Sequence, residues 1–181
     1  LLKILDNFKD KKILVIGDIM LDKYIWGDVS RISPEAPVQV VNVLRETYEA
    51  GGAANVANNI AALNGSALMV GISGNDEARN ILMEEMKRKY INTDGIIIDR
   101  DKPTTQKVRI LGKGQQLLRV DYENREHIHH DIENNVIKFI EKNIKDADVV
   151  IISDYAKGVI TKEVSKKLIE LAKQHKKPVI V

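Results

Sequence analysis

The stretch Lys12-Ile13-Leu14-Val15-Ile16-Gly17 is apolar after its first residue and ends on a glycine. A run this short and this continuously hydrophobic is typical of a strand that is covered on both faces of a sheet. Four further runs of the same kind follow along the chain, at residues 67–71, 95–98, 149–152 and 179–181. The sequence therefore predicts five strands of one mostly parallel sheet.

The segments between these runs have the period of helices. Residues 53–63 are rich in Ala and Asn, residues 77–89 carry one apolar face, and Ile or Val recurs every four residues over 132–144. Thr161 is suited to cap a last helix. The alternation of short apolar runs with amphipathic helices predicts an α/β fold, a Rossmann-like sheet flanked by helices.

Three β-rich runs with polar residues inside them break this pattern, at residues 38–44, 105–111 and 116–122. The last two are joined by Gly112-Lys113-Gly114-Gln115, which predicts a β-hairpin. Because charged residues occur within these runs, at least one face is expected to meet water, a ligand or a second subunit. We interpret segments 36–45 and 104–122 as a small accessory β-sheet lid.

The composition limits the class of protein. The 181 residues include 28 Lys and Arg, 26 Asp and Glu and no Cys, so the formal net charge is +2 and a disulfide scaffold is excluded. The basic excess is spread along the chain, and no apolar run reaches the ~18 residues of a membrane span, so we expect neither nucleic acid nor a membrane as partner. The first twelve residues mix Lys and Asp too early for a signal peptide, which favours a cytoplasmic protein.

Acidic residues follow the first predicted strand, in Gly17-Asp18-Ile19-Met20-Leu21-Asp22. Ligands of doubly wound sheets bind beyond the carboxyl ends of the strands, so Asp18 and Asp22 are placed to accept hydrogen bonds from hydroxyl groups. The segment is not G-x-G-x-x-G, which argues against a dinucleotide fingerprint. The alternative is that both acids lie in a solvated loop, since Asp is a common turn former.

Two glycines open the next helix, in Ala50-Gly51-Gly52-Ala53-Ala54-Asn55. They let a ligand approach the backbone, and the first turn of a helix offers unpaired N–H groups and a partial positive charge. Asn55 in that turn can both donate and accept hydrogen bonds. The alternative is an ordinary glycine turn with tight packing of the helix on the sheet.

Two further segments carry charges suited to a polar ligand. Ser153-Asp154-Tyr155-Ala156-Lys157-Gly158 follows a predicted strand and combines an acid, a phenol and an ammonium. On the predicted hairpin, Lys107 and Arg109 alternate onto one strand face and could bind a phosphate, Arg as a fork and Lys as a point charge. The alternatives are a surface turn with Lys157 solvated, and a solvated β face.

The segment His127-Ile128-His129-His130-Asp131 contains residue types that bind metals. It lacks the i, i+4 spacing of a helical zinc site, and the chain has no Cys. We interpret it as a solvated loop before a helix and expect no protein-ligated metal. No Ser-His-Asp or Cys-His set is evident in the sequence, so covalent catalysis has no candidate nucleophile.

Four motifs stand out when they are read together: Gly17–Asp22, Ser30-Arg31-Ile32-Ser33-Pro34-Glu35-Ala36-Pro37, Gly51-Gly52-Ala53-Ala54-Asn55-Val56-Ala57 and Ser153–Gly158. They resemble the ribokinase-like (PfkB-type) carbohydrate kinase family, and within it most closely the kinases of D-glycero-β-D-manno-heptose 7-phosphate. The resemblance implies transfer of the γ-phosphoryl group of ATP, with Mg²⁺, to the anomeric hydroxyl of that sugar. The product is the 1,7-bisphosphate, on the route to ADP-heptose for lipopolysaccharide.

The resemblance also implies roles for individual residues. It assigns Asp22 to the sugar hydroxyls and the 7-phosphate to Lys107 and Arg109, with Arg31 as a further candidate. The lid is implied to cover the sugar and to form a homodimer contact. The remaining residues of the implied substrate site are Gly51, Gly52, Asn55, Asp154 and Lys157.

The implied catalytic base lies beyond Val181, the last residue of this sequence. The family carries it in a Gly-Ala-Gly-Asp segment in the second half of its fold, together with most ATP-binding loops, and residues 1–181 contain no such segment. We therefore expect the N-terminal part of a single kinase domain, with the C-terminal half missing and no activity alone. The alternatives are another ribokinase-like sugar kinase and a non-catalytic sugar-binding or dimerisation module.

Overall fold

The structure, a computed structural model, describes residues 7–9 and 11–181. Its body is a five-stranded sheet with strand order β5-β4-β1-β8-β9, in which all neighbouring strands are parallel. The five predicted strands are confirmed. They are β1 (Lys12–Gly17), β4 (Ser66–Ser73), β5 (Asn92–Ile98), β8 (Val149–Ser153) and β9 (Val179–Ile180).

The last strand is one residue shorter than the apolar run that predicts it. Strand β9 ends at Ile180, whereas the sequence analysis placed Val181 in the strand as well. The ladder with β8 pairs Val150 with Val179 and Ile151 with Ile180 and goes no further. Val181 is the last residue of the chain, is 90% exposed and lies outside the paired residues.

Strand β1 shows why both faces of this sheet need cover. Ile13 and Val15 pack into one hydrophobic core, whereas Leu14 and Ile16 pack into the other. All four side chains are almost completely buried. Because successive side chains of a strand point to opposite faces, a continuous apolar run gives a strand that is buried on both sides.

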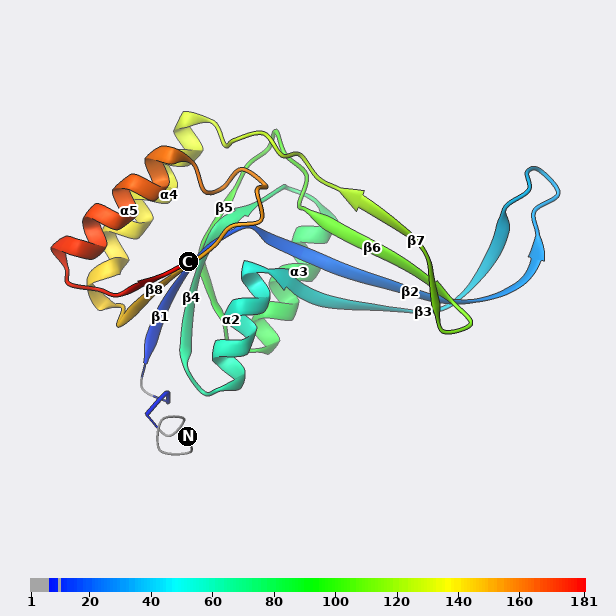
Figure 1. The fold of residues 1–181 in the computed structure, drawn as a ribbon, viewed down its shortest axis with the longest axis horizontal. Coiled ribbons are helices and arrows are strands. Elements are labelled where there is room, and N and C mark those ends of the chain that lie inside the picture. The colour runs from blue at the N-terminus through cyan, green and yellow to red at the C-terminus, as the bar shows by residue number, and fades with distance from the viewer. Residues whose placement is uncertain (1–6, 10) are drawn as a thin grey trace.

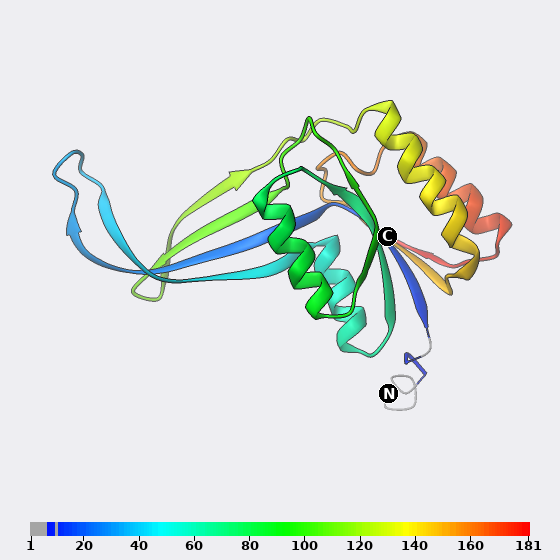
Figure 2. The same cartoon turned by 180° about the vertical axis from the view of Figure 1, so that it is seen from behind.

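Helices provide that cover, two on each face (Figures 1 and 2). One pair is α2 (Ala53–Ala62) and α3 (Glu77–Arg88), and the other is α4 (His130–Asn143) and α5 (Lys162–Gln174), with a short 3₁₀ turn η1 (Ile144–Asp146) after α4. The hydroxyl of Thr161 accepts a hydrogen bond from the Val164 N–H (3.1 Å), which confirms the predicted cap of α5.

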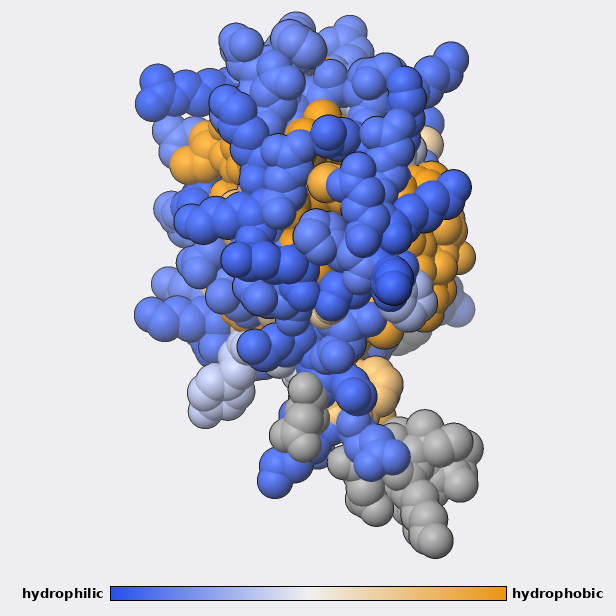
Figure 3. Space-filling view, turned by 90° about the vertical axis from the view of Figure 1, so that its left-hand side faces the viewer, coloured by the Kyte–Doolittle hydropathy of each residue, from blue (hydrophilic) through white to orange (hydrophobic). Residues whose placement is uncertain are grey.

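Seen from the end that carries α4 and α5, the surface is mostly hydrophilic (Figure 3). Across the part of the chain that the structure covers, no helix is long and apolar enough to span a membrane.

A second, four-stranded sheet extends away from the body, and we call it the lid (Figure 1). Its order is β3-β2-β6-β7, with β2 antiparallel to β3 and parallel to β6. The predicted hairpin is confirmed as the antiparallel pair of β6 and β7. The four strands are β2 (Ile19–Ile32), β3 (Gln39–Gly52), β6 (Gln106–Gly112) and β7 (Gln115–Tyr122).

The segment that follows the first strand is not a loop, which corrects the sequence interpretation. Strand β2 begins at Ile19 and includes Asp22, and β3 continues to Gly52, so the paired glycines end a strand. Asp and Lys disfavour the β state, but β2 is hydrogen bonded along its length to β3 and β6, and this pairing decides its conformation. Both expected lid segments lie in this sheet, which also takes in β2.

Candidate functional site

Three elements meet at Gly17 and Asp18, where β1 passes into β2. The Asp18 N–H donates to the carbonyl of Ser153 at the end of β8 (3.1 Å), and the Ala53 N–H at the start of α2 donates to the carbonyl of Asp18 (2.9 Å). A Cβ on residue 17 would lie 2.0 Å from the Ser153 carbonyl oxygen, so this approach requires glycine. The end of β1, the end of β8 and the N-terminus of α2 therefore share one edge of the sheet, the edge at which doubly wound folds bind ligands.

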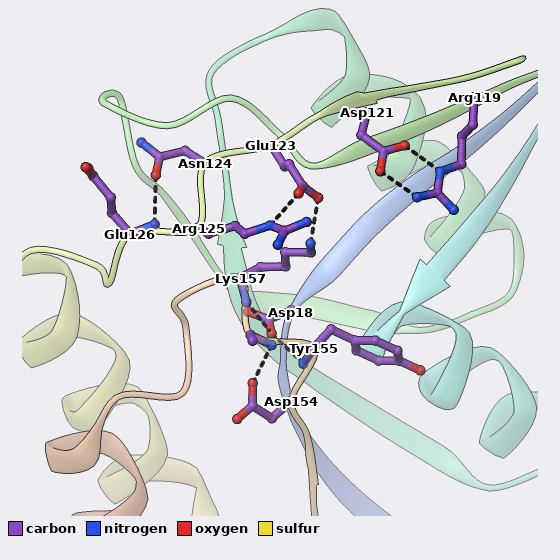
Figure 4. A network of polar contacts seen from close by, with 11 residues as sticks. Asp18, Arg119, Asp121, Glu123, Asn124, Arg125, Glu126, Asp154, Tyr155 and Lys157 are labelled. Atoms are coloured by element: carbon purple, nitrogen blue, oxygen red, sulfur yellow. Dashed lines mark hydrogen bonds and ion pairs between the residues drawn. The ribbon is translucent and has the colours of Figure 1, made fainter.

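The Asp18 side chain, which is 1% exposed, anchors the loop after β8 (Figure 4). Its Oδ2 accepts hydrogen bonds from the N–H groups of Tyr155 (2.8 Å) and Lys157 (3.1 Å), and its Oδ1 accepts one from Val159 (3.2 Å). Charge-assisted bonds of this kind are stronger than neutral ones, and they satisfy the buried carboxylate. The interpretation of Asp18 as a residue of a solvated loop is therefore wrong.

Asp22 lies near the root of the lid. Lys107 is opposite Asp22 in the register of β2 and β6, and Arg109 is opposite Tyr24. Arg109 Nη1 donates to Asp22 Oδ1, and its guanidinium lies over the Tyr24 ring, 5.1 Å from the ring centre. The side chains of Asp22 and Arg109 are only 18% and 22% exposed, so Asp22 is a paired strand residue and not a free loop acid.

Burial and charge oppose each other at Arg109. Burial by itself lowers the pKa of the guanidinium, but the hydrogen bond and the negative charge of Asp22 raise the pKa of Arg109 above its ordinary value. The guanidinium of Arg109 therefore stays charged. The structure thus brings Asp22 together with Lys107 and Arg109, which the sequence analysis named as a pair on a separate segment.

The paired glycines lie at the same place. A Cβ on Gly51 would come 2.2 Å from Asp22 Oδ2, so glycine lets the carboxylate pack directly on the backbone of β3. Gly52 has φ +58° and precedes α2, and a Cβ there would lie 2.3 Å from the carbonyl oxygen of Asp18. Asn55 lies in the first turn of α2 and is exposed.

Asp154 and Lys157 are engaged away from Asp22. Asp154 is exposed, and its Oδ1 accepts a hydrogen bond from the Ala156 N–H (2.8 Å) within its own turn. Lys157 Nζ lies 2.6 Å from Glu123, as Figure 4 shows. The hydrogen bond from Lys157 lowers the pKa of Glu123. The loop reaches the shared edge, but its lysine is held by the segment after β7.

Arg31 lies far from the other candidates. It is exposed near the outer end of β2. Strand β2 covers about 30 Å between Asp22 and Arg31 at ~3.3 Å per residue. Within one chain, Arg31 is therefore not brought to the pair of Asp22 and Arg109.

The sequence analysis missed a buried polar group behind this edge. Lys102 is 8% exposed between β5 and β6, and its Nζ donates to the carbonyl of Glu126. Burial lowers the pKa of Lys102, although nearby acidic groups oppose the shift. The polar run at residues 99–105, between two strands, is the signal that could have revealed it. A small cavity here is lined by Asp18, Ser73, Lys102 and Lys157 among others.

The magnesium ion that the resemblance implies would need several oxygen ligands in one place. Within residues 7–9 and 11–181, no three or more His, Cys, Asp or Glu side chains are grouped so that they could hold an ion. In the histidine segment, His130 Nδ1 lies 3.3 Å from Glu133 one turn further along α4. These residues provide no cluster that fits the magnesium ion implied by the resemblance.

Comparison with known proteins decides the family. Residues 10–181 match the sequence profile of the pfkB family carbohydrate kinases. The chain belongs to this family. Among curated relatives of this pfkB-family chain, bifunctional protein HldE of Wolinella succinogenes is 46% identical over 169 residues, which cover 93% of the chain. Bifunctional protein HldE of Desulfatibacillum aliphaticivorans is 41% identical over 174 residues, or 96% of the chain. The chain spans about 36% of the length of each.

Solved structures support the fold of this pfkB-family chain. A carbohydrate kinase from Agrobacterium tumefaciens aligns with a TM-score of 0.70 at 19% identity, over 93% of this chain and 52% of its own. The Arabidopsis thaliana ribokinase complexed with ribose and ATP aligns with a TM-score of 0.63 at 18% identity, over 94% of this chain and 52% of its own. At these identities the likeness concerns the fold, and it confirms the ribokinase-like α/β architecture.

Proposed function

We propose that this chain supplies the sugar-binding and lid part of an ATP-dependent kinase of D-glycero-β-D-manno-heptose 7-phosphate. The reaction phosphorylates the anomeric hydroxyl and leads to ADP-heptose and lipopolysaccharide, in the cytoplasm, with Mg²⁺ as the ion of ATP. The similarity to the HldE proteins supports this sugar. The observation that carries the proposal is the cluster of Asp22, Lys107 and Arg109 at the root of the lid.

The two kinds of charge in this cluster suit the two ends of a phosphorylated sugar. The Asp22 carboxylate accepts hydrogen bonds from sugar hydroxyls, and charge-assisted bonds of this kind orient the ring. Arg109 binds the 7-phosphate as a planar fork, and Lys107 adds a point charge on the same face of the lid. Glycine at position 51 lets the carboxylate pack on the backbone of β3, because a Cβ there would lie 2.2 Å from Asp22 Oδ2.

The remaining candidates act from the neighbouring elements. Gly52 and Asn55 present the N-terminal turn of α2, whose partial positive charge favours oxygen-rich ligands. Asp154 and Lys157 contact the substrate from the loop that Asp18 holds at this edge. For Lys157 this requires the ammonium to leave Glu123.

Calorimetric titration of the chain with heptose 7-phosphate, heptose and ribose tests this proposal. We expect heptose 7-phosphate to bind at least about 10-fold more tightly than heptose, because a phosphate adds charge-assisted hydrogen bonds. Equal binding of all three sugars would favour another ribokinase-like sugar kinase. Absence of binding to either heptose contradicts the proposal.

We also propose that the chain alone does not transfer the phosphoryl group. The family's Gly-Ala-Gly-Asp segment, which the resemblance places beyond Val181, is not among its residues. Heptose-dependent ADP formation at rates typical of kinases would contradict this.

A non-catalytic sugar-binding or dimerisation module is the second candidate. It is favoured if the chain binds the sugar but, when joined to the rest of its protein, still yields no ADP.

We propose a homodimer contact through the lid. Its strands and their connection expose large apolar side chains, of which Leu44 is 75% exposed, and such groups are stabilised when a second copy covers them. In this dimer, Arg31 on the lid of one copy contacts the cluster of Asp22, Lys107 and Arg109 in the other copy. Sedimentation equilibrium is expected to show a dimer, and Leu44→Glu is expected to weaken it. A chain that stays monomeric at a protein concentration of roughly tens of micromolar, at which even a weak dimer forms, contradicts the contact.

A further inference from the structure

Asp22 and Arg109 both belong to the proposed sugar site, yet they bind each other. Arg109 Nη1 donates to Asp22 Oδ1. The second oxygen, Oδ2, packs so closely on the backbone of Gly51 that a Cβ there would lie 2.2 Å away. Each carboxylate oxygen offers two acceptor positions, and a sugar hydroxyl that takes the position used by Arg109 has to displace the guanidinium.

The guanidinium has no equivalent partner to move to within the lid. Its other neighbours are the Tyr24 ring, 5.1 Å away, and the charge of Asp121. The Asp121 carboxylate is already held by Arg119 through bonds of 2.9 and 3.1 Å (Figure 4). Because the Arg109 side chain is only 22% exposed, water would replace Asp22 incompletely, so a sugar that displaced Arg109 would lose part of the stabilisation of this charge.

A phosphate group removes this cost. It offers Arg109 two or more anionic oxygens in a geometry that the planar fork matches, and Lys107 adds a second cation on the same face. When Arg109 turns to the phosphate, Asp22 Oδ1 becomes available to the hydroxyls. Binding of the phosphate and release of the carboxylate are then one coupled event.

We propose that the ion pair of Asp22 and Arg109 makes sugar binding conditional on a phosphate, so that the site selects phosphorylated sugars by an exchange of partners. This inference rests on the proposed function, because it takes the same cluster as the sugar site. It differs from a phosphate-binding role for Arg109 in one consequence. Loss of Arg109 weakens binding of the phosphorylated sugar but strengthens binding of the plain sugar.

The test is the substitution Arg109→Gln, titrated with heptose 7-phosphate and with heptose. We expect the affinity for heptose 7-phosphate to fall by about 10-fold or more and the affinity for heptose to rise by about 5-fold, in line with the strength of single charge-assisted bonds. Weak heptose binding is measured by chemical-shift titration. Urea unfolding of each variant verifies that the protein is folded.

Arg119→Gln is the matched control. Arg119 is opposite Arg109 in the register of β6 and β7, so it lies on the same face, but it pairs with Asp121. We expect Arg119→Gln to leave the affinity for heptose unchanged. In the double variant Asp22→Asn, Arg109→Gln, the gain in heptose affinity is expected to disappear.

The outcomes separate this inference from the function on which it rests. If Arg109→Gln weakens heptose 7-phosphate but leaves heptose unchanged or weaker, the exchange is overturned and the proposed sugar site stands. If Arg119→Gln strengthens heptose equally, the gain is a general effect of charge and the exchange is overturned. If the unchanged chain binds neither sugar, the proposed function fails and the inference fails with it.

Discussion

The substitution Asp18→Ala is expected to lower the free energy of unfolding by about 3–5 kcal/mol. It removes the acceptor of three backbone N–H groups, those of Tyr155, Lys157 and Val159. The Asp18 side chain is 1% exposed, so water does not replace it without a rearrangement of the loop. Urea unfolding followed by circular dichroism measures the change.

A nearby acid provides the control for that measurement. Asp154 is exposed and accepts one hydrogen bond within its own turn, so Asp154→Ala is expected to cost less than about 1 kcal/mol. If Asp18→Ala does not fold, Asp18→Asn keeps one acceptor oxygen and should give an intermediate stability. A loss below about 1 kcal/mol for Asp18→Ala would mean that the loop does not depend on this carboxylate.

The substitution Asp22→Ala is expected to weaken the binding of heptose 7-phosphate by about 10- to 100-fold, the value of one or two hydrogen bonds to a charged group. The loss for heptose should be smaller, because Arg109 holds the carboxylate when no phosphate is present. Stability should change little, by about 1 kcal/mol, since the ion pair is partly solvated. Calorimetric and chemical-shift titrations measure the two affinities.

Asp28→Ala is the matched control for Asp22→Ala. Asp28 is an exposed acid further along β2, and its Oδ1 accepts a hydrogen bond from the N–H of Val29 (2.9 Å). We expect no change in either sugar affinity for this variant. An unchanged affinity for heptose 7-phosphate in Asp22→Ala would remove Asp22 from the site.

Asp18, just before β2, and Asp22, within β2, thus have different roles at this edge of the sheet. Asp18 is turned inward and holds the loop after β8, whereas Asp22 lies on the lid and faces Arg109. The sequence analysis treated them as one motif with one alternative. Their different burial separates an effect on stability from an effect on binding, and the two substitutions measure these effects independently.

Local patterns were enough for the body of the fold. Ile13 to Ile16 predict a strand buried on both faces, and the repeat of Ile and Val over 132–144 predicts α4. Both patterns depend only on the period of the backbone and on the exclusion of apolar side chains from water. The same reasoning does not reach β2, whose Asp, Lys and Gly residues mask a strand that two distant partners complete.

The candidate site could be predicted from the sequence less fully than the fold of the body. Arg109 is 87 residues away from Asp22 in the chain, and no periodicity connects them. The same is true of the tie between Asp18 and the loop after β8. The sequence also could not tell that Arg31 lies at the outer end of a long strand, since that distance depends on β2 being extended.

By itself, the sequence determined the α/β class, the two covered faces of the sheet, the hairpin and the motifs that resemble the carbohydrate kinases, because these depend on neighbours along the chain. Only the tertiary structure decided which charged groups meet. It buried Asp18 under three N–H groups, paired Asp22 with Arg109 and held Lys157 at Glu123. The physical reason is that a charge is stabilised by whichever partner the packing of strands brings within about 3 Å, and that choice is made by register and topology rather than by sequence order.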